Sequence, residues 1–480
     1  MPKRIYRIRK NRFRQWRLLF VCIVVGWSMM SGAAAQGNQT NKVRSMILMI
    51  GDGMGSAHIK MAGDAAGKPL VMESLPVKGR IKTDAANGEI TDSAAAGTAL
   101  ACGMKTDIGV IGLSPDGEKL KSIAELARDA GKRVGILSSA PVNHATPAAF
   151  YAKVPSRGAY YQIGLQAFAS GFEVLGAGLL GARQAQGKTG AGSDLRELAE
   201  NAGYKTVRPR AELNALEPGV SRVFIDPDRF YPEPGGSYTR KFDSERDITL
   251  AQMTGQALKL LDSDAGFFLM VEGAAIDWAC HGNNVTGMLI ETLAFDEAVA
   301  VAKAFTEANP ETLLVITSDH ETGGLTMGEE YKPQMAGRLL KSGEPGRTTI
   351  HDLITSQFDS GKESDPASWE EASSYFSDVL GVKNDESLAM LRSEYNEIAG
   401  TEGLEKSYAI RKLARKIVKL TEITAGITWT TGGHTDTPVP LYAMGPGSDR
   451  FEGLQENIMV AHHGIALLIP SSSSVPAKKK

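Results

Sequence analysis

The sequence has few cysteines, no internal repeat and no apolar run long enough to cross a membrane. Cysteine occurs three times, and Cys22 lies in the N-terminal segment, so only Cys102 and Cys280 remain beyond it. Two cysteines so far apart do not make a disulfide framework, and we expect free thiols. The longest apolar run, Leu18–Met30, is shorter than the about 20 residues that a membrane span needs. With 42% hydrophobic and 22% charged residues, the composition is that of a soluble globular protein.

The first segment of the chain differs from the rest. Residues 1–35 begin with a head of eight basic residues and no acidic one, continue with the apolar run and end in Ala33-Ala34-Ala35. This order is typical of a secretory signal peptide with Gln36 as the first mature residue. It predicts a periplasmic or secreted bacterial protein with no membrane association after cleavage. The long basic head leaves an uncleaved anchor as the alternative.

The charge of the remaining chain argues against nucleic-acid binding. The whole chain has 53 basic and 55 acidic residues, and removing the eight basic residues of segment 1–35 leaves 45 against 55, a net charge of −10. Nucleic-acid binding needs a basic face, so we expect no nucleic-acid partner. The C-terminal residues 471–480 combine serines with three lysines and are expected to form a solvated polar tail.

The pattern of apolar residues predicts an α/β protein. Four apolar runs lack alternation and predict strands buried on both faces of a parallel sheet; they are Val43–Ile50, Arg133–Ser138, Phe267–Val271 and Thr312–Thr317. Helical spacing of apolar residues occurs between them, in Leu120–Ala130 and Thr286–Ala304. Strands and helices in alternation predict a doubly wound, mostly parallel central sheet flanked by helices.

One long segment departs from this alternation. Residues 329–422 are rich in Glu, Lys, Ser and Arg, show helical spacing and contain no strand-like run. They predict a mostly helical insertion that caps the sheet, between a core at 36–328 and a return to the core at 423–470. The Gly- and Ala-rich stretch Gly176–Gly192 is expected to be a loop.

Acidic residues follow three of the predicted strands. Asp52 comes after the first strand, Glu272 after the third, and Asp319-His320 after the fourth. Ligands of open α/β sheets bind beyond the carboxyl ends of the strands. Carboxylates gathered there repel each other unless a cation is bound, so the pattern predicts a metal site.

Histidines in loop-like settings add a second class of ligand. Asp277 and His281 are four residues apart, and His434 lies in Thr431-Gly-Gly-His434-Thr-Asp436. His144 and His320 also stand beside polar or small residues. A lone histidine is more often structural, but several with carboxylates nearby favour zinc, which binds imidazole nitrogen and carboxylate oxygen.

A nucleophile is available at a predicted helix start. In Thr91-Asp92-Ser93-Ala-Ala-Ala, Thr91 or Asp92 is expected to cap a helix whose first turn holds Ser93. Unpaired N–H groups and the helix dipole at such a terminus favour an anion such as phosphate. The alternative is that Ser93 is only part of the cap.

From Asp52 to His434, these motifs resemble those of the alkaline phosphatases in order and spacing. The resemblance implies hydrolysis of small-molecule phosphate monoesters through a phosphoserine on Ser93, with two zinc ions and one magnesium ion, in a possible homodimer. It implies that Arg157 grips the substrate phosphate and that Asp92 positions Arg157. The implied metal ligands are Asp277, His281 and His434 for the first zinc, Asp52, Ser93, Asp319 and His320 for the second, and Asp52, His144, Thr146 and Glu272 for the magnesium.

Two residues depart from the most familiar bacterial pattern of this family. His144 stands where those enzymes have an aspartate, so the third site could hold zinc instead of magnesium. Trp278 stands where a lysine or histidine commonly helps to hold phosphate through water. Trp278 would then either change phosphate release and the pH optimum or act only as a wall of the substrate site.

Two other functions compete with the monoesterase. The same metal site could serve a phosphodiesterase or a sulfatase of the same superfamily. However, the C-x-P-x-R motif of sulfatases is absent, and diesterases often have a threonine nucleophile and lack the arginine, whereas this chain has Ser93 and Arg157. An exported phosphate-binding protein without catalysis would not require so many metal ligands.

Overall fold

The computed structural model describes residues 42–179, 194–228, 230–232, 243–341, 369–378, 381–399 and 401–469. The expected signal peptide (1–35) and polar tail (471–480) lie outside the described residues, as do residues 180–192 of the expected loop. Within the described ranges no helix is both long and apolar enough to span a bilayer. Cys102 and Cys280 are free thiols.

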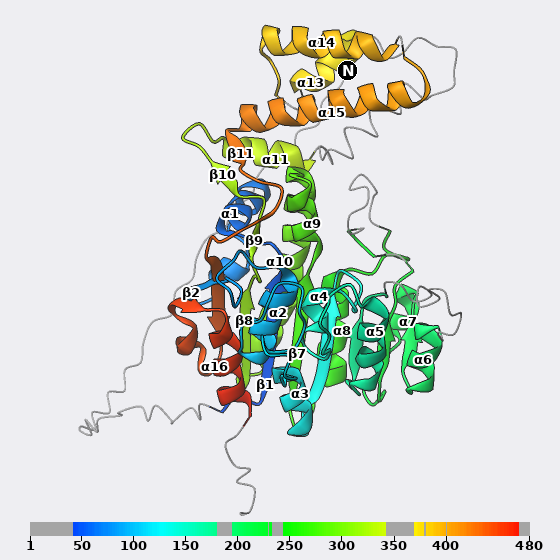
Figure 1. Ribbon diagram of the computed structural model, residues 1–480, viewed down its shortest axis with the longest axis vertical. Helices are drawn as coiled ribbons and strands as arrows, with labels where there is room; N and C mark the ends of the chain where they lie inside the picture. The colour runs from blue at the N-terminus through cyan, green and yellow to red at the C-terminus, as the bar shows by residue number, and fades with distance from the viewer. Residues whose placement is uncertain are drawn as a thin grey trace, which may run out of the picture. The chain divides into compact units, whose positions relative to one another are not determined.

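A ten-stranded sheet forms the centre of the fold, in the order β14-β2-β13-β8-β1-β7-β3-β4-β6-β5 (Figure 1). Every pairing in it is parallel except those of β13, which runs antiparallel to β8 and β2. The prediction of a mostly parallel sheet is therefore confirmed. The strands are β1 Ser45–Gly51, β2 Val77–Lys82, β3 Arg133–Ser138, β4 Val174–Gly176, β5 Lys205–Val207, β6 Val223–Ile225, β7 Phe267–Gly273, β8 Thr312–Thr317, β13 Val439–Met444 and β14 Gly453–Glu456.

The four predicted strands are the four central neighbours β8-β1-β7-β3. All residues of β1, β7 and β8 are buried, as expected for continuous apolar runs covered on both faces. Side chains of β1 alternate between two cores: Ile47 and Met49 face one, and Met46, Leu48 and Ile50 face the other. The register pairs Ile50 with Glu272 and with Thr317, so the strands end at a common edge.

Helices cover both faces of the sheet, which confirms the doubly wound architecture. One core receives side chains from α1, α7, α8, α9, α10 and α11, and the other from α2, α3, α4, α5, α6 and α16. The first group spans α1 Ser56–Ala66, α7 Arg210–Asn214, α8 Leu250–Leu261, α9 Ala275–His281, α10 Val285–Ala308 and α11 Pro333–Lys341. The second spans α2 Ser93–Cys102, α3 Ile123–Asp129, α4 Ala145–Ala148, α5 Tyr160–Ala169, α6 Leu195–Asn201 and α16 Ile458–Leu468. Two 3₁₀ turns are η1 Met72–Ser74 and η2 Ser448–Phe451.

The described part of segment 329–422 is mostly helical. It contains α11, α13 Trp369–Asp378, α14 Asp385–Ala399 and most of α15, which spans Gly403–Ala425. Helices α13–α15 lie together (Figure 1). They share a small core of their own, which includes Phe376, Leu391 and Leu413. The chain leaves α15 through Gly426, whose φ of 70° suits a residue without Cβ.

Two short antiparallel ladders return the chain toward the carboxyl edge of the sheet. β10 (Leu325–Met327) pairs with β11 (Ile427–Trp429), and β9 (Glu321–Thr322) pairs with β12 (His434–Thr435). The second ladder places His434 opposite Thr322. His434, which is far away in sequence, thereby lies beside the Asp319-His320 pair that follows β8.

Candidate metal and phosphate site

Acidic side chains converge at the carboxyl edge of β1, β7 and β8. Asp52 Oδ1 lies 3.5 Å from Nε2 of His320, and Asp319 Oδ2 lies 3.2 Å from the same nitrogen. Thr146 Oγ1 donates a 3.4 Å hydrogen bond to Asp52 Oδ2. Glu272 is the penultimate residue of β7, one residue before the strand ends. The rule that strand ends share an edge thus brings these predicted ligands together.

This acidic cluster carries more negative charge than its protein surroundings compensate. Burial, followed by the charges of Asp319, Asp277 and Glu272, raises the pKa of Asp52 well above its usual value. Burial likewise raises the pKa of Glu272 to about 7 and that of Asp319 to about 6. Asp52 Oδ1, Glu272 Oε1 and Asp319 Oδ2 are buried without a hydrogen-bond partner among the described residues. Unpaired buried oxygens of this kind are costly, and a bound cation would compensate them.

A second cluster joins Asp277, His281 and His434. His281 Nδ1 lies 2.7 Å from the carbonyl oxygen of Gly432, and His434 Nδ1 lies 2.8 Å from that of Thr91. Because a carbonyl only accepts, each Nδ1 must carry the proton and a neutral ring then leaves Nε2 as a lone pair. The two Nε2 atoms face each other at 3.1 Å.

A metal cation between the facing nitrogens of His281 and His434 would compensate their lone pairs. Asp277 oxygens lie 3.4 Å and 3.6 Å from the same two Nε2 atoms and add further lone pairs. The three side chains form one group whose ligand atoms lie within 4.8 Å of one another, and Asp52, Asp277 and His320 form another. Imidazole nitrogen with carboxylate oxygen is a donor set that zinc accepts, so the residues fit the expected metal.

Thr322 links these two clusters. Its hydroxyl donates to Asp277 Oδ1 at 2.6 Å and lies 3.2 Å from Nδ1 of His320. Since the Thr322 proton goes to Asp277, its oxygen accepts from His320 Nδ1–H. His320 Nε2 is therefore the unprotonated atom, and it points at the acidic cluster. Burial lowers the pKa of His320 to about 3, which keeps the ring neutral.

The nucleophile candidate lies at the start of α2. Asp92 caps this helix by accepting from the Ala95 N–H at 3.0 Å, and Ser93 is the first helical residue. Small residues let the helix sit buried, and a Cβ on Gly97 would lie 3.3 Å from the Thr146 Cα. Ser93 Oγ lies 3.3 Å from His320 Nε2, so the hydroxyl borders the acidic cluster.

Asp92 also holds Arg157. Its Oδ1 accepts a second bond from the Gly109 N–H at 3.1 Å, and its Oδ2 lies 2.9 Å from Arg157 Nη1. Burial raises the pKa of Asp92, but the N–H donors of Ala95 and Gly109 and the Arg157 guanidinium outweigh it and bring the pKa below its usual value. An ionised Asp92, the residue before Ser93, thus fixes the Arg157 guanidinium.

Glu272, His144 and Trp278 are the remaining predicted residues. Ser138 Oγ donates to Glu272 Oε2 at 2.5 Å, and the free Oε1 remains available to a cation. His144 caps α4, and its ring meets that of Trp278 edge-on at 5.8 Å. Burial, with a smaller contribution from the Arg157 charge, lowers the pKa of His144 to about 4. The neutral ring has a buried Nδ1 with no partner among the described residues, as a metal ligand requires.

Sequence reasoning missed the polar residues that orient these ligands. Ser138, at the end of a predicted strand, could have been found by the same strand-end rule as Glu272. Thr322 and Ser318, whose hydroxyl accepts from the Met54 N–H at 2.9 Å, carry no motif of their own. Their only signal is that they flank Asp319-His320.

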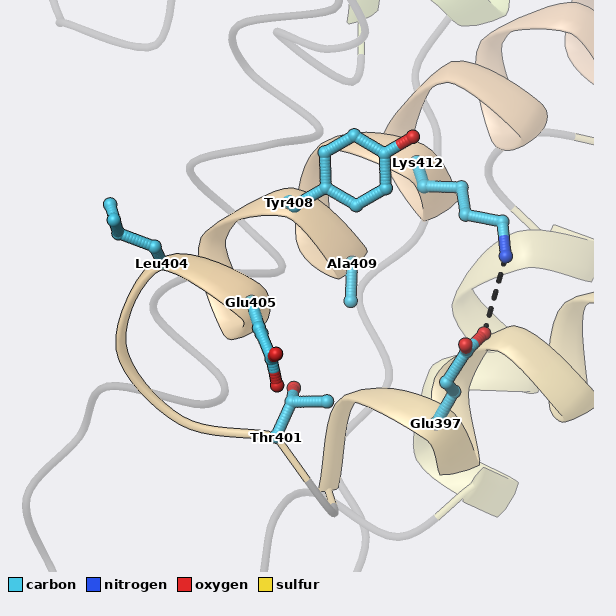
Figure 2. Close-up of a pocket in the computed structure, with 7 residues that line it drawn as sticks. All are labelled: Glu397, Thr401, Leu404, Glu405, Tyr408, Ala409 and Lys412. Carbon is cyan, nitrogen blue, oxygen red and sulfur yellow. Dashed lines mark hydrogen bonds and ion pairs between the residues drawn. The ribbon is translucent and has the colours of Figure 1, made fainter.

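A separate pocket lies in the helical insertion and shares no residue with this site. It measures about 380 Å³ and lies between α14 and α15 (Figure 2). Its one cation, Lys412, already lies 3.3 Å from Glu397 and 2.9 Å from Glu394. The pocket therefore lacks an uncompensated positive charge for phosphate. Its lining consists of Glu397, Thr401, Leu404, Glu405, Tyr408, Ala409 and Lys412.

Known proteins resemble this chain over nearly all of the described range. The family profile of alkaline phosphatase matches residues 43–183 and 180–468. Alkaline phosphatase 4 of Bacillus subtilis is 31% identical over 440 residues, which cover 88% of each chain. Among solved structures, the cold-active alkaline phosphatase of a Shewanella species is 28% identical with a TM-score of 0.71, covering 89% of this chain and all of the other. The Thermus thermophilus enzyme is 27% identical with a TM-score of 0.69, covering 91% and 95%.

The match spans both the sheet and the return segment that carries His434. It also extends through the helical insertion, so the likeness concerns the whole architecture and not one motif. The chain belongs to the alkaline phosphatase family and is a phosphoric monoester hydrolase.

Proposed function

We propose that this chain hydrolyses phosphate monoesters through a phosphoserine formed on Ser93. The observation that carries the proposal is the position of the Ser93 hydroxyl. It lies 3.3 Å from His320 Nε2, and the preceding residue, Asp92, holds the Arg157 guanidinium. A nucleophile next to a metal-type donor cluster, preceded by a residue that fixes a cation, suits transfer of a doubly charged phosphoryl group.

Arg157 selects for monoesters in this proposal. Its guanidinium is planar and can donate to two phosphate oxygens at once. A monoester offers the required non-bridging oxygens, whereas a second ester group of a diester would meet the cation. The N-terminal N–H groups of α2 add a second source of positive potential at the same place.

The reaction through Ser93 consumes only the ester and water. Ser93 Oγ bonds to phosphorus as its proton is released, and the bond to the ester oxygen breaks with its electron pair on that oxygen, which takes up a proton and leaves as the alcohol. Water then attacks the phosphoserine, inorganic phosphate leaves, and the Ser93 hydroxyl is restored. The burial of Ser93, which is 2% exposed, keeps bulk solvent from competing with the first step.

Three metal sites fit the donor groups. Two zinc ions and one magnesium ion would polarise the reacting oxygens and stabilise their charge when bound. Because His144 offers an imidazole nitrogen, the third site also suits zinc. The proposed ligands are Asp277, His281 and His434 for the first zinc, Asp52, Ser93, Asp319 and His320 for the second, and Asp52, His144, Thr146 and Glu272 for the third site.

The test compares three esters on one preparation. The chain from Gln36 onward, supplied with zinc and magnesium, is assayed from neutral to strongly alkaline pH on an aryl phosphate monoester, its diester and its sulfate. We expect a dominant monoester rate that a chelator abolishes, and a phosphorylated Ser93 peptide in acid-quenched samples. A dominant diester or sulfate rate, or full activity in Ser93→Ala, would sink the proposal.

Export and assembly are proposed on the sequence and the family alone. We propose that residues 1–35 are removed on export, and N-terminal sequencing of the secreted protein would test cleavage before Gln36. We also propose a homodimer. Light scattering of the purified chain would contradict this if it gave the mass of one chain.

A further inference from the structure

A buried imidazole lies behind the metal ligands without being one of them. His58, on α1, is fully buried. Its Nδ1 lies 2.7 Å from the Gly55 N–H and accepts its hydrogen bond, so in the neutral ring Nε2 carries the proton. Burial lowers the pKa of His58 to about 3, which keeps the ring neutral and its tautomer fixed. Gly55 belongs to the loop that carries Asp52.

The protonated nitrogen of His58 faces two further ligand-bearing segments. Cys280 Sγ and Glu321 Oε1 each lie 3.6 Å from His58 Nε2. The sulfur distance is that of a hydrogen bond, and the carboxylate adds an electrostatic contact. Cys280 directly precedes His281 on α9, and Glu321 directly follows His320. The indole of Trp429 stacks on the imidazole with the ring centroids 5.9 Å apart.

Glu321 extends the contacts to a fourth segment. Its Oε2 accepts from Thr435 Oγ1 at 2.5 Å and from the Gly324 N–H at 3.2 Å. Thr435 directly follows His434 on β12. The approach of Glu321 to the first loop is so close that a Cβ on Gly55 would lie 2.4 Å from Glu321 Cγ. Glycine is therefore required there, and the packing of the two segments is specified by sequence.

We propose that His58 and Glu321 are positioning residues that hold the four ligand-bearing segments together whether or not metal is bound. The inference rests on the proposed metal centre. Each segment is short or irregular: α9 has seven residues and β12 has two. We call the contacts of His58 and Glu321 the brace; they add to the pairing of β12 with β9 and to the bond between Ser318 and the Met54 N–H. Without the brace, more of the ordering of these segments would fall to the metal, at the expense of binding free energy. With the brace, the ligands are already placed.

If the brace positions the metal ligands, removing part of it should lower zinc affinity by more than the loss of buried packing alone would. Removing partners that orient metal ligands typically weakens metal binding by about 10- to 100-fold. His58→Ala removes the contacts to three segments, and Thr435→Val removes the side-chain bond between Glu321 and Thr435 while the backbone pairing of β12 with β9 remains. His58→Asn keeps an acceptor that can reach the Gly55 N–H and should recover part of the affinity.

Two matched controls separate positioning from stability. Met61 is fully buried on the same helix as His58 and touches none of the four segments through a hydrogen bond, so Met61→Ala reports the loss of packing. Thr437 is exposed two residues beyond Thr435, and Thr437→Val makes the same chemical change without touching Glu321.

The experiment measures zinc affinity of chelator-stripped protein by competition with a chromophoric chelator, followed by kcat and KM at saturating zinc. We expect His58→Ala and Thr435→Val to raise the zinc Kd by at least about tenfold, with both controls near wild type. Saturating zinc should restore kcat and leave KM unchanged. An unchanged Kd in Thr435→Val, or equal losses in His58→Ala and Met61→Ala, would overturn the brace. A wild-type chain that binds no zinc would instead refute the metal centre on which it rests.

Discussion

Replacing Arg157 tests the phosphate-binding geometry most directly. The bond to Asp92 uses Nη1, and the planar guanidinium can still donate two parallel bonds to a phosphate. Each charge-assisted hydrogen bond contributes about 1.5–2 kcal/mol at a site that is partly open to solvent. Arg157→Ala should therefore lose about 3–4 kcal/mol of transition-state stabilisation, or about 10²- to 10³-fold in kcat/KM. Arg157→Lys keeps the charge but not the fork and should lose about tenfold.

The assay compares monoester and diester on each Arg157 variant. Because the diester does not use both guanidinium bonds, its rate should change little, and the monoester-to-diester ratio should fall with the monoester rate. The inhibition constant of inorganic phosphate should rise in parallel. Asp92→Asn serves as the control that leaves the guanidinium but loosens its anchor, and it should give an intermediate loss. If the monoester and diester rates fell equally, Arg157 would not be the source of selectivity.

Three further outcomes follow from the site. Thr322→Val removes the hydroxyl that fixes the tautomer of His320. It should weaken zinc binding by about tenfold in a chelator competition. An unchanged zinc affinity would contradict this role of Thr322. The metal-free chain should lose stability as pH rises from about 4 through about 7. Burial raises the pKa of Asp319 to about 6 and that of Glu272 to about 7, so the folded state holds protons that the unfolded state has already released. A melting temperature of the metal-free protein that rose between about pH 4 and about pH 7 would refute this prediction. Burial raises the pKa of Cys102 to about 12 and that of Cys280 well above its usual value, so mass spectrometry should find neither thiol alkylated at neutral pH until the chain unfolds.

The centre of the sheet could be predicted because its strands carry continuous apolar runs. The outer strands could not. β4, β5 and β6 have three residues each, too few to show a period. β2 alternates polar and apolar residues, and β13 contains Pro440, which cannot donate to a ladder although the strand lies between β2 and β8. Tertiary packing overrides these local signals.

The residues that gather at the candidate site could be predicted because acids at strand ends and histidines beside them are rare combinations. The way in which these residues come together could not be predicted. The position of His434 beside His320 depends on the pairing of β12 with β9, two strands of two residues each that are separated by more than a hundred residues, the helical insertion among them. Such short ladders leave no pattern in the sequence, because two residues cannot show alternation.

The hydrogen-bond partners of the histidines matter as much as the histidines. A neutral imidazole offers a lone pair to a metal from only one nitrogen, and the group at the other nitrogen decides which. The carbonyl oxygen of Gly432 fixes the proton on Nδ1 of His281, and that of Thr91 does the same for His434. The hydroxyl of Thr322 fixes the proton on Nδ1 of His320. Two of these three groups belong to the backbone, so no side-chain motif can encode them. They are set by where the loops pass, and the proposed brace holds one of those loops through the bond of Glu321 to Thr435, three residues beyond Gly432.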